Sequence, residues 1–499
     1  MSAATALRPL ASETGIAPPA KARPLAFLRE RGMGASVLVA ALSAGFGVLL
    51  LTATGYLSGL MRIVYGGSLT LEIAIVVVAA VFIGIAMYVG AIVTSNTFST
   101  VVAGRTRRIA LMRLIGASAR SQRAAVARQG LVVGAIGALT GLVVALVIGA
   151  VGTRIADRLV AERVESFGFP DMPPVDYDVL QLRVLLPVIA VVLTTWLAAW
   201  AGSRRVLDVT PLQALGGSAP RSAAEARGTR KRHIGSIVLL AVGFGLLGAG
   251  VAIGLVSPAG LLIAFPGGVL SFTGLITGST LVMPPLLRLV GRLFGRSATA
   301  RMAAENAPRY PERSSRMAIG VVIGVTLVTM FAVASESAKA VMLANAGGNA
   351  REIEVVLDMF SMVMMSMIGV SAVIAAVGLV NLLTIGIVQR RTELGLLRAV
   401  GLSNPQVRRM VLLEAAHVTI AAVAFGLVLG VGYGWAGAQA LLGSVSLTGE
   451  TGGSLLAPAV PWSVVAVIVG ATAVLTLIAA VGPTRLATRV SPVAALAAD

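Results

Sequence analysis

The sequence predicts an all-α polytopic membrane protein with about ten transmembrane helices, arranged as two parallel four-helix repeats joined by two linking helices. Hydrophobic residues make up 57% of the 499 residues and charged residues only 12%, about half the charged share of a typical soluble domain. The apolar residues gather in long segments, and the two halves of the chain match at a constant spacing. A chain of this composition needs lipid as a second, apolar solvent.

Ten segments are long and apolar enough to cross a membrane, which takes about 20 residues of α-helix. They are rich in Gly, Ala and Val, small residues that let helices pack closely in lipid. The segments are 34–58, 71–99, 130–153, 184–202, 234–256, 259–283, 317–335, 361–388, 411–436 and 463–482. The polar residues 1–33 that precede them are expected to form a cytoplasmic tail rather than a signal peptide.

The basic residues fall in short segments between the apolar ones, which is the pattern of the positive-inside rule. With ten spans and the N-terminus inside, the arginine-rich segments all lie on the cytoplasmic side: 105–129, 204–232, 288–316 and 390–409. The excess of Arg over Lys is typical of a bacterial genome of high GC content. We therefore expect a bacterial inner-membrane protein with both termini in the cytoplasm, and we attribute the net charge of +19 to topology rather than to nucleic-acid binding.

The internal repeat has an offset of 285 residues. The identical pairs include Gly84–Gly369, Asn96–Asn381, Arg113–Arg398, Gly116–Gly401, Ser118–Ser403, Arg123–Arg408 and Gly141–Gly426. Matched Asn and Arg are harder to ascribe to chance than matched Gly. The predicted plan is a tail 1–33, a first repeat 34–215 with a hinge 105–129, a basic linker 216–233, two linking helices 234–283, a basic segment 284–316, and a second repeat 317–499 with a hinge 389–410. An even number of linking helices keeps both repeats in the same orientation.

Each hinge has the same plan, and we call them the first hinge and the second hinge. A short helix of interleaved arginines and apolar residues leads to Gly116 or Gly401, and glycine is suited to end a helix. Ser118 or Ser403 follows and is suited to cap the next helix. Such a hinge fits either anchoring to anionic lipid or docking of a soluble partner. Duplication of the whole unit favours docking.

The second hinge contains the run Arg-Thr-Glu-Leu-Gly-Leu-Leu-Arg-Ala-Val-Gly-Leu-Ser at 391–403, which resembles the pattern of FtsX/MacB-type (FtsX-like) ABC transporter permeases. Two similar motifs end the repeats, Pro-Leu-Gln-Ala-Leu at 211–215 and Pro-Val-Ala-Ala-Leu at 492–496. The run Ala-Glu-Asn-Ala-Pro-Arg-Tyr-Pro-Glu-Arg at 304–313 is similar to the family's lead-in to a repeat. Ten spans in a four-two-four layout resemble the family's single-chain members.

The resemblance implies that each hinge is a coupling helix for a separate cytoplasmic ABC ATPase, and that two hinges engage an ATPase dimer. The partner would then bind and hydrolyse ATP, so we expect the chain to be no enzyme and to hold no cofactor or metal. By position, the implied coupling residues are Arg108, Arg113, Gly116, Ser118, Glu393, Arg398, Gly401 and Ser403. The family's hinge acid is Glu393, but Arg108 takes its place in the first hinge, so the two docking surfaces are expected to differ.

The implied function is a permease subunit that exports or extracts an amphiphilic or hydrophobic substrate, such as an antimicrobial peptide, a lipid or a drug, by mechanotransmission. An alternative is a non-transporting lever that regulates an extracytoplasmic partner such as a cell-wall hydrolase. The outside loops after the first and seventh spans, about 12 and 25 residues long, are short for that role. A secondary transporter is a third possibility, which the scarcity of acids in the spans disfavours.

Few residues in the spans carry chemistry. Asn96 and Asn381 are expected to make interhelical hydrogen bonds, with contact to substrate as the alternative. Glu414 and His417, one helical turn apart, are expected to be an interface pair rather than part of a proton path. The chain has no cysteine and no Walker A motif, so disulfides are excluded and ATP binding by that motif is not expected.

Overall fold

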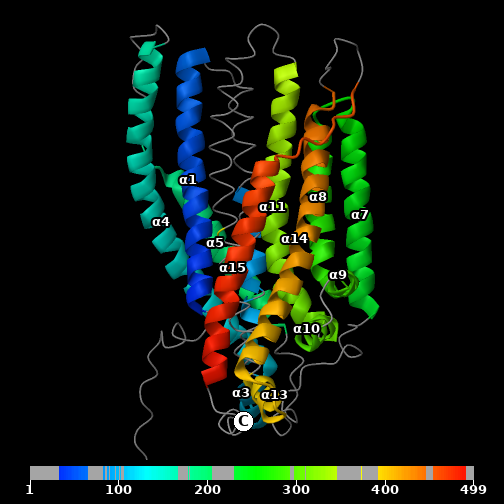
Figure 1. The fold of residues 1–499 in the computed structure, drawn as a ribbon. Helices are drawn as coiled ribbons and strands as arrows, with labels where there is room; N and C mark the ends of the chain where they lie inside the picture. Colours follow the sequence, from blue (N-terminus) through cyan, green and yellow to red (C-terminus); the bar gives the residue numbers. More distant parts are fainter. Residues whose placement is uncertain are drawn as a thin grey trace, which may run out of the picture.

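The computed structural model describes residues 33–65, 83–84, 87–88, 90–95, 97–99, 102, 106–166, 178, 180–204, 230–292, 297–309, 311–344, 373, 391–444 and 453–489. Within these ranges every regular element is a helix and no strand occurs. The long helices run side by side in one common direction (Figure 1). By length and composition, seven of them are able to cross a membrane: Met33–Tyr56, Ala119–Arg158, Leu182–Gly202, His233–Gly254, Gly260–Thr277, Met317–Ala344 and Asn404–Leu442.

These seven stretches coincide with seven of the ten predicted spans. The predicted spans 71–99 and 361–388 lie largely outside the described residues. The last, 463–482, falls in α15 (Trp462–Arg489), whose apolar part is Trp462–Ile478. The prediction of an all-α, multi-pass membrane protein is therefore confirmed, because several long apolar helices lie parallel in one bundle.

The first repeat supplies α1 (Met33–Tyr65), α4 (Ala119–Ser166) and α5 (Leu185–Gly202), with the short 3-10 helix η2 (Leu182–Val184) before α5. Small and β-branched side chains fill the core between these helices: Ala40, Ala44, Val48, Ala138, Ala145, Val184, Val188 and Val191. Such side chains let the helix backbones approach closely, which is a main source of helix association in lipid.

Helix α4 extends well beyond its predicted span. Its 48 residues correspond to about 72 Å at 1.5 Å per residue, whereas the hydrocarbon core of a bilayer is about 30 Å thick. The predicted spans 130–153 and 184–202 leave residues 154–183 as a loop, but the helix continues to Ser166 because no Gly or Pro interrupts a run rich in good helix formers. The Tyr56 hydroxyl donates a hydrogen bond of 2.8 Å to Asp157 and so ties α1 to this extension.

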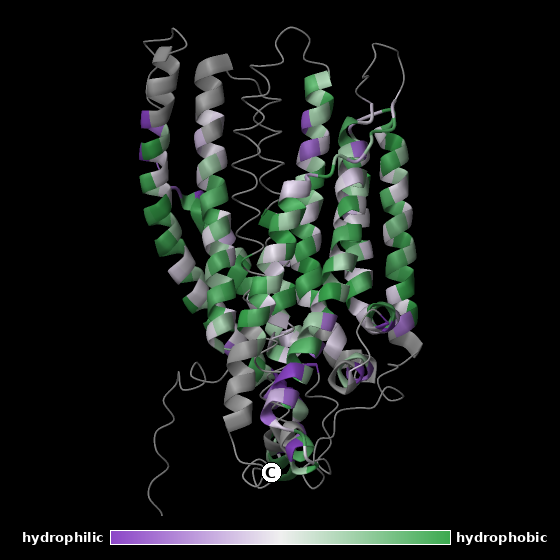
Figure 2. Ribbon diagram, in the orientation of Figure 1, coloured by the Kyte–Doolittle hydropathy of each residue, from purple (hydrophilic) through white to green (hydrophobic). Residues whose placement is uncertain are grey.

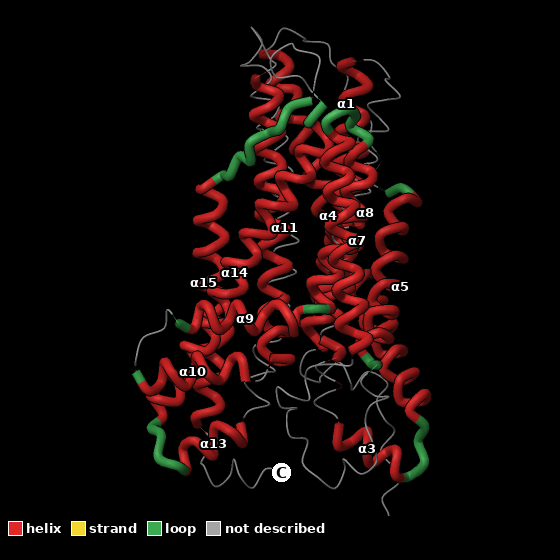
Figure 3. The backbone as a smooth tube through the Cα atoms, turned by 90° about the vertical axis from the view of Figure 1, so that its right-hand side faces the viewer, coloured by secondary structure: helices red, strands yellow, loops and turns green. Residues whose placement is uncertain are grey.

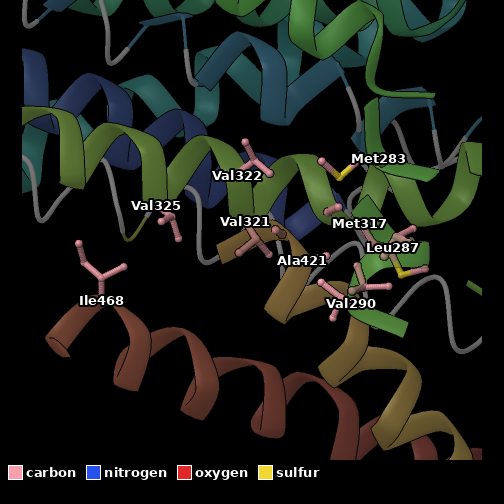
Figure 4. Packing of buried hydrophobic residues seen from close by; sticks show 12 residues of the cluster. Met283, Leu287, Val290, Met317, Val321, Val322, Val325, Ala421 and Ile468 are labelled. Carbon is pink, nitrogen blue, oxygen red and sulfur yellow. The ribbon is translucent and has the colours of Figure 1, made fainter. Parts of the chain in front are cut away.

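The second repeat supplies α11 (Pro311–Ala344), α14 (Asn404–Leu442) and α15. The predicted outside loop 336–358 likewise begins as helix, since α11 continues to Ala344. Figure 4 shows the core of this bundle, where side chains of α11, α14 and α15 meet. The labelled residues are Met283, Leu287, Val290, Met317, Val321, Val322, Val325, Ala421 and Ile468.

The linking helices are α7 (Arg230–Gly254) and α8 (Gly260–Thr277). Helix α8 is shorter than the span 259–283 that the sequence predicts. The helix is interrupted at Gly278, where α8 ends and α9 (Ser279–Gly291) begins. Both α9 and α10 (Ala298–Arg309) run across the direction of the spans (Figures 1 and 3). We call α9 and α10 the elbow. Most of α9, all of α10 and the start of α11 fall in the predicted basic segment 284–316, whereas most of the linker 216–233 lies outside the described residues.

Helix α8 contacts both repeats at the centre of the molecule. The Tyr88 hydroxyl of the first repeat lies 2.8 Å from Thr273 Oγ1, and Ser271 Oγ lies 2.8 Å from the Tyr433 hydroxyl of α14. An apolar cluster surrounds these contacts and joins α1, residues 88–93, α8, α11 and α14: Val39, Val93, Phe272, Leu275, Ile319, Ile323, Leu327 and Tyr433. Apolar residues follow the middle of the bundle, and hydrophilic ones gather near α10 and the start of α14 (Figure 2).

Candidate functional site

The first hinge begins with α3 (Thr106–Leu114), which lies beneath the first bundle. Its inner face carries Ile109 and Ala110, which are 6% and 0% exposed. Both belong to one apolar cluster with Met33, Phe98, Val102, Val126, Val133 and Ala199. Because these residues come from α1, α4, α5 and residues 98–102, the hinge helix is seated on the base of its own bundle.

Gly116 ends α3 in a left-handed backbone conformation with φ of +101°, which glycine adopts without a Cβ penalty. Its N–H donates to the carbonyl of Arg113 at 3.2 Å, and the N–H of Ala117 donates to that of Met112 at 2.9 Å. This pair of bonds is a Schellman motif, which satisfies carbonyls at the end of a helix. The predicted helix stop is confirmed.

The second hinge repeats this geometry after α13 (Arg391–Ala399). Gly401 has φ of +112°. Its N–H donates to the Arg398 carbonyl at 3.1 Å, and the N–H of Leu402 donates to the Leu397 carbonyl at 3.1 Å. Each of these atoms lies 285 residues after its counterpart in the first hinge. Leu397 and Leu402 pack on the base of α14 against Val407, Met410 and Val411.

The two serines cap the helices that follow, as predicted. Ser118 Oγ accepts a hydrogen bond of 3.1 Å from the N–H of Ser121. Ser403 forms a complete capping box: its Oγ accepts from the N–H of Gln406 at 3.4 Å, and its own N–H donates to Gln406 Oε1 at 2.9 Å. Two otherwise unpaired N–H groups are thereby satisfied in the second hinge. Each hinge is thus a short helix, a turn at a left-handed glycine, and a serine-capped start of the next helix.

Matched apolar side chains project from the two hinges. Leu111 and Ile115 are 51% and 80% exposed in the first, and Leu396 and Val400 are 54% and 75% exposed in the second. Helices α3 and α13 lie at the same end of the molecule (Figure 1), on opposite sides of that end when the molecule is turned (Figure 3). Neither helix belongs to a stretch able to cross a membrane. The molecule therefore presents two similar groups of exposed apolar side chains at one end.

The charged residues singled out in the hinges lie at equivalent places. Arg108 is the third residue of α3 and Glu393 the third residue of α13. The Glu393, Arg113 and Arg398 side chains are half-buried, whereas the Arg108 side chain lies outside what the structure describes. The Arg108–Glu393 difference is thus a difference between equivalent turns of the two hinge helices, and the coupling roles of these residues stay predictions.

Asn96 and Asn381 lie outside the described residues, and their interhelical hydrogen bonds stay predictions. Within the described residues, no three His, Cys, Asp or Glu side chains gather as they do around a metal ion.

Trp200, near the end of α5, braces the first hinge. The Arg123 guanidinium donates to the Trp200 carbonyl through Nε and Nη2, at 3.3 and 3.1 Å. It also lies 3.8 Å from the centre of the indole ring, a cation–π contact. Arg204 approaches the same ring at 5.9 Å. The base of α4 is thereby held to the end of α5; sequence identifies Arg123 as a repeated residue but not its distant partner.

Glu414 and His417 connect α14 to the elbow. Asn306 of α10 donates from Nδ2 to Glu414 Oε2 at 3.2 Å. His417 Nε2 lies 2.6 Å from the carbonyl oxygen of Leu287 on α9, and the nitrogen must donate because a carbonyl only accepts. Glu414 is 7% exposed and His417 is fully buried. Both residues lie at the interface between α14 and the elbow, as predicted, and the structure adds their partners on the elbow, Asn306 and Leu287.

The sequence model of the FtsX-like permease C-terminal domain matches residues 80–207 and 365–492. Both the starts and the ends of these matches differ by 285 residues, the offset of the predicted repeat, and each match contains one hinge. Over 63 residues the chain is 32% identical to the ABC transporter permease YtrF of Bacillus subtilis (strain 168), which is 13% of this chain and 14% of that protein. The two family matches cover just over half of the chain, so it belongs to the FtsX-like permease family and is a membrane permease component of the ABC transporter type.

Proposed function

We propose that the chain is the transmembrane subunit of an ABC transporter whose ATP-hydrolysing subunits are separate cytoplasmic proteins. The observation that carries the proposal is the pair of hinges with the same backbone geometry at one end of the molecule (Figure 3). Two such docking sites in one chain suit an ATPase dimer with one hinge on each subunit. The partner binds ATP, and both termini of the chain lie with the hinges in the cytoplasm of a bacterial cell.

Exposed apolar side chains give the hinges their affinity for a partner. Ile115 and Val400 stand at the breaks, with 80% and 75% of their surfaces accessible. Burial of each such side chain contributes roughly 1.5–3 kcal/mol. The half-buried Arg113 and Arg398 beside them supply charge for orientation. Lipid is the alternative occupant of such a surface. Other apolar residues, Ile109 and Ala110 in the first hinge and Leu397 in the second, already pack on the base of their own bundle, which supports a protein partner for the exposed ones.

The proposed cargo is an amphiphilic or hydrophobic molecule, such as an antimicrobial peptide, a lipid or a drug, taken from the membrane. The apolar packing where the two repeats meet at α8 supports this class, since Val39 of the first repeat, Phe272 of α8 and Ile323 of the second repeat belong to one buried cluster. Movement of the hinges on ATP binding would change this interface through α4 and α14, because each of these helices runs from a hinge through the membrane.

A non-transporting lever that acts on an extracytoplasmic partner is the second candidate. The observation in its favour is the length of α4, which continues to Ser166 beyond its apolar part. From Arg158, where the apolar stretch ends, to Ser166 that extension spans about 12 Å at 1.5 Å per residue. A rigid arm of this length is able to carry a movement out of the membrane, as a regulator of a cell-wall hydrolase would require.

The docking proposal is tested by expressing the full chain with its ABC ATPase and purifying the complex. The double variant Ile115→Asp/Val400→Asp should lose the ATPase and the ATP hydrolysis that accompanies it, without a change in thermal stability. Val256→Asp is the matched control, because Val256 is 84% exposed in the turn between α7 and α8 at the other end. Equal recovery of ATPase by the double variant and the control would refute docking through the hinges.

The orientation is tested with single cysteines, since the natural chain has none. A cysteine at Arg120, in the first hinge, should react with a membrane-impermeant thiol reagent only after the cells are opened. A cysteine at Val256 should react in intact spheroplasts. The opposite result would place the hinges outside and exclude a cytoplasmic ATPase partner.

A further inference from the structure

The base of α14 is attached to the elbow by two polar contacts, one half-buried and one buried, from residues one helical turn apart. The Glu414–Asn306 and His417–Leu287 hydrogen bonds measure 3.2 and 2.6 Å. Glu414 lies ten residues beyond the start of α14 at Asn404, about 15 Å along the helix at 1.5 Å per residue. The contacts thus lie directly above the second hinge, on the path by which its movement enters the bundle.

The elbow is in turn packed into the second bundle. Met283, Leu287 and Val290 of α9 point into the core formed by α11 and α14 (Figure 4). Gly291 lies against the His417 ring, since a Cβ at that position would be 3.3 Å from His417 Cε1. Because α9 follows α8 directly and α10 is followed by α11, displacement of the elbow acts on the linking helices as well as on the second repeat.

The first repeat has different residues at the same places. At the offset of 285, Gln129 corresponds to Glu414 and Val132 corresponds to His417. The first hinge is braced instead by Arg123 and Trp200, which belong to the same repeat, and the residue that corresponds to Trp200 is Arg485. The two hinges therefore have equal shapes but unequal connections: the first is braced within its bundle, the second on the elbow.

We propose that Glu414 and His417 are positioning residues that transmit movement of the second hinge to the elbow and through it to the linking helices α7 and α8. Among the described residues, the Arg123–Trp200 brace of the first hinge stays within its own bundle, so the first hinge acts on that bundle. The inference rests on the proposed docking of an ATPase and adds that the two ATPase subunits drive different parts of the permease. A buried carboxylate and a buried imidazole suit this role, because hydrogen bonds of buried polar groups are costly to break when the helices shift apart.

The test measures two distances by spin labels in the complete complex of chain and ATPase in lipid nanodiscs. Cysteines at Leu197 on α5 and Met302 on α10 report on the elbow, and both side chains are exposed, by 51% and 37%. A second label pair, with cysteines at Leu197 and at the exposed Arg409, reports on the base of α14. In the otherwise unsubstituted chain, ATP with vanadate should change both distances.

Glu414→Leu and Asn306→Leu should abolish the change at Met302 and preserve the change at Arg409, with the ATPase still bound. Glu414→Gln should behave as the unsubstituted chain, since its amide oxygen still accepts from Asn306. Gln129→Leu, the matched control in the first repeat, should leave the change at Met302 intact. Asn306 is half-buried at the surface of α10, so Asn306→Leu provides the test even where Glu414→Leu prevents folding.

Two outcomes would overturn the inference. The first is a change at Met302 that persists in both leucine variants, because the elbow would then move without the Glu414–Asn306 contact. The second is loss of both distance changes in Asn306→Leu with the ATPase bound, because the residue would then support the fold of the whole base. Absence of bound ATPase, or of any distance change in the unsubstituted chain, would instead refute the proposed function.

Discussion

Gly116 and Gly401 adopt the same left-handed backbone conformation, with φ of +101° and +112°, at positions 285 residues apart. Each glycine follows a nine-residue helix and lies two residues before the serine that caps the next helix. No atom lies within 4 Å of a Cβ built at either glycine. The conformation, and not lack of space, therefore requires glycine at both breaks.

Replacement of either glycine by alanine should weaken its hinge. A residue with a Cβ pays roughly 1–2 kcal/mol in the left-handed region, so Gly116→Ala and Gly401→Ala should shift the break and reduce ATPase recovery on purification. Gly432→Ala is the control, because Gly432 lies within α14 and its Cβ would also meet nothing. That variant should be neutral or slightly stabilising, and an equal loss of ATPase in all three would contradict the role of the break.

The two caps should differ in strength. Ser403→Ala removes a capping box with Gln406, whereas Ser118→Ala removes a single bond from Ser121. Loss of an N-cap costs about 1 kcal/mol, and the box should add to that. We expect amide exchange over residues 404–408 to accelerate more in Ser403→Ala than exchange over 119–123 does in Ser118→Ala. Ser403→Asp, which retains an acceptor, should stay close to the natural chain; if it exchanges as fast as Ser403→Ala, the cap is not the cause.

A matched pair of packing glycines should tolerate alanine unequally. A Cβ on Gly141 of α4 would collide with the backbone carbonyl of Ala41 on α1, whereas one on Gly426 of α14 would lie 2.9 Å from the side-chain Cβ of Val325. The overlap at Gly141 is much closer and involves backbone atoms of two residues of α1, so Gly141→Ala should lower the melting temperature in detergent more than Gly426→Ala. Gly432→Ala again serves as the control. The reverse order would show that α1 and α4 separate more readily than α11 and α14.

Gln439 should hold the outer segment 453–461 in place. It is fully buried; its Oε1 accepts from the N–H of Leu456 at 2.7 Å, and its Nε2 donates to the carbonyl of Ser454 at 2.9 Å. Leaving a buried backbone group unpaired costs about 1–3 kcal/mol, so Gln439→Leu should release the segment.

The measurement is the rate of thiol labelling of a single cysteine introduced at Leu456, a side chain that is 5% exposed. Gln439→Leu should raise this rate. A cysteine at the neighbouring Leu455, which is 72% exposed, should react equally fast with and without the substitution. An unchanged rate at 456 would mean that other contacts, such as Trp435 Nε1 with the Leu456 carbonyl at 2.7 Å, suffice.

The hinges were predictable to a large extent because their structure is local. A glycine that must be left-handed and a serine that caps are recognised from residue type and spacing, and the bonds they make span at most five residues. The spans were predictable because length and hydropathy alone decide whether a helix crosses a membrane. The extensions of α4 and α11 were not, since a helix does not have to stop where its apolar run does.

The sequence by itself determined that the chain crosses the membrane several times, that its halves are copies, and that each copy has a helix, a glycine break and a capped restart. These features depend on hydropathy, repetition and short-range hydrogen bonding. Only the tertiary structure decided that Trp200 braces the first hinge and that Glu414 and His417 connect the second to the elbow. Those contacts join residues between 77 and 130 positions apart, and packing, not local pattern, brings such residues together.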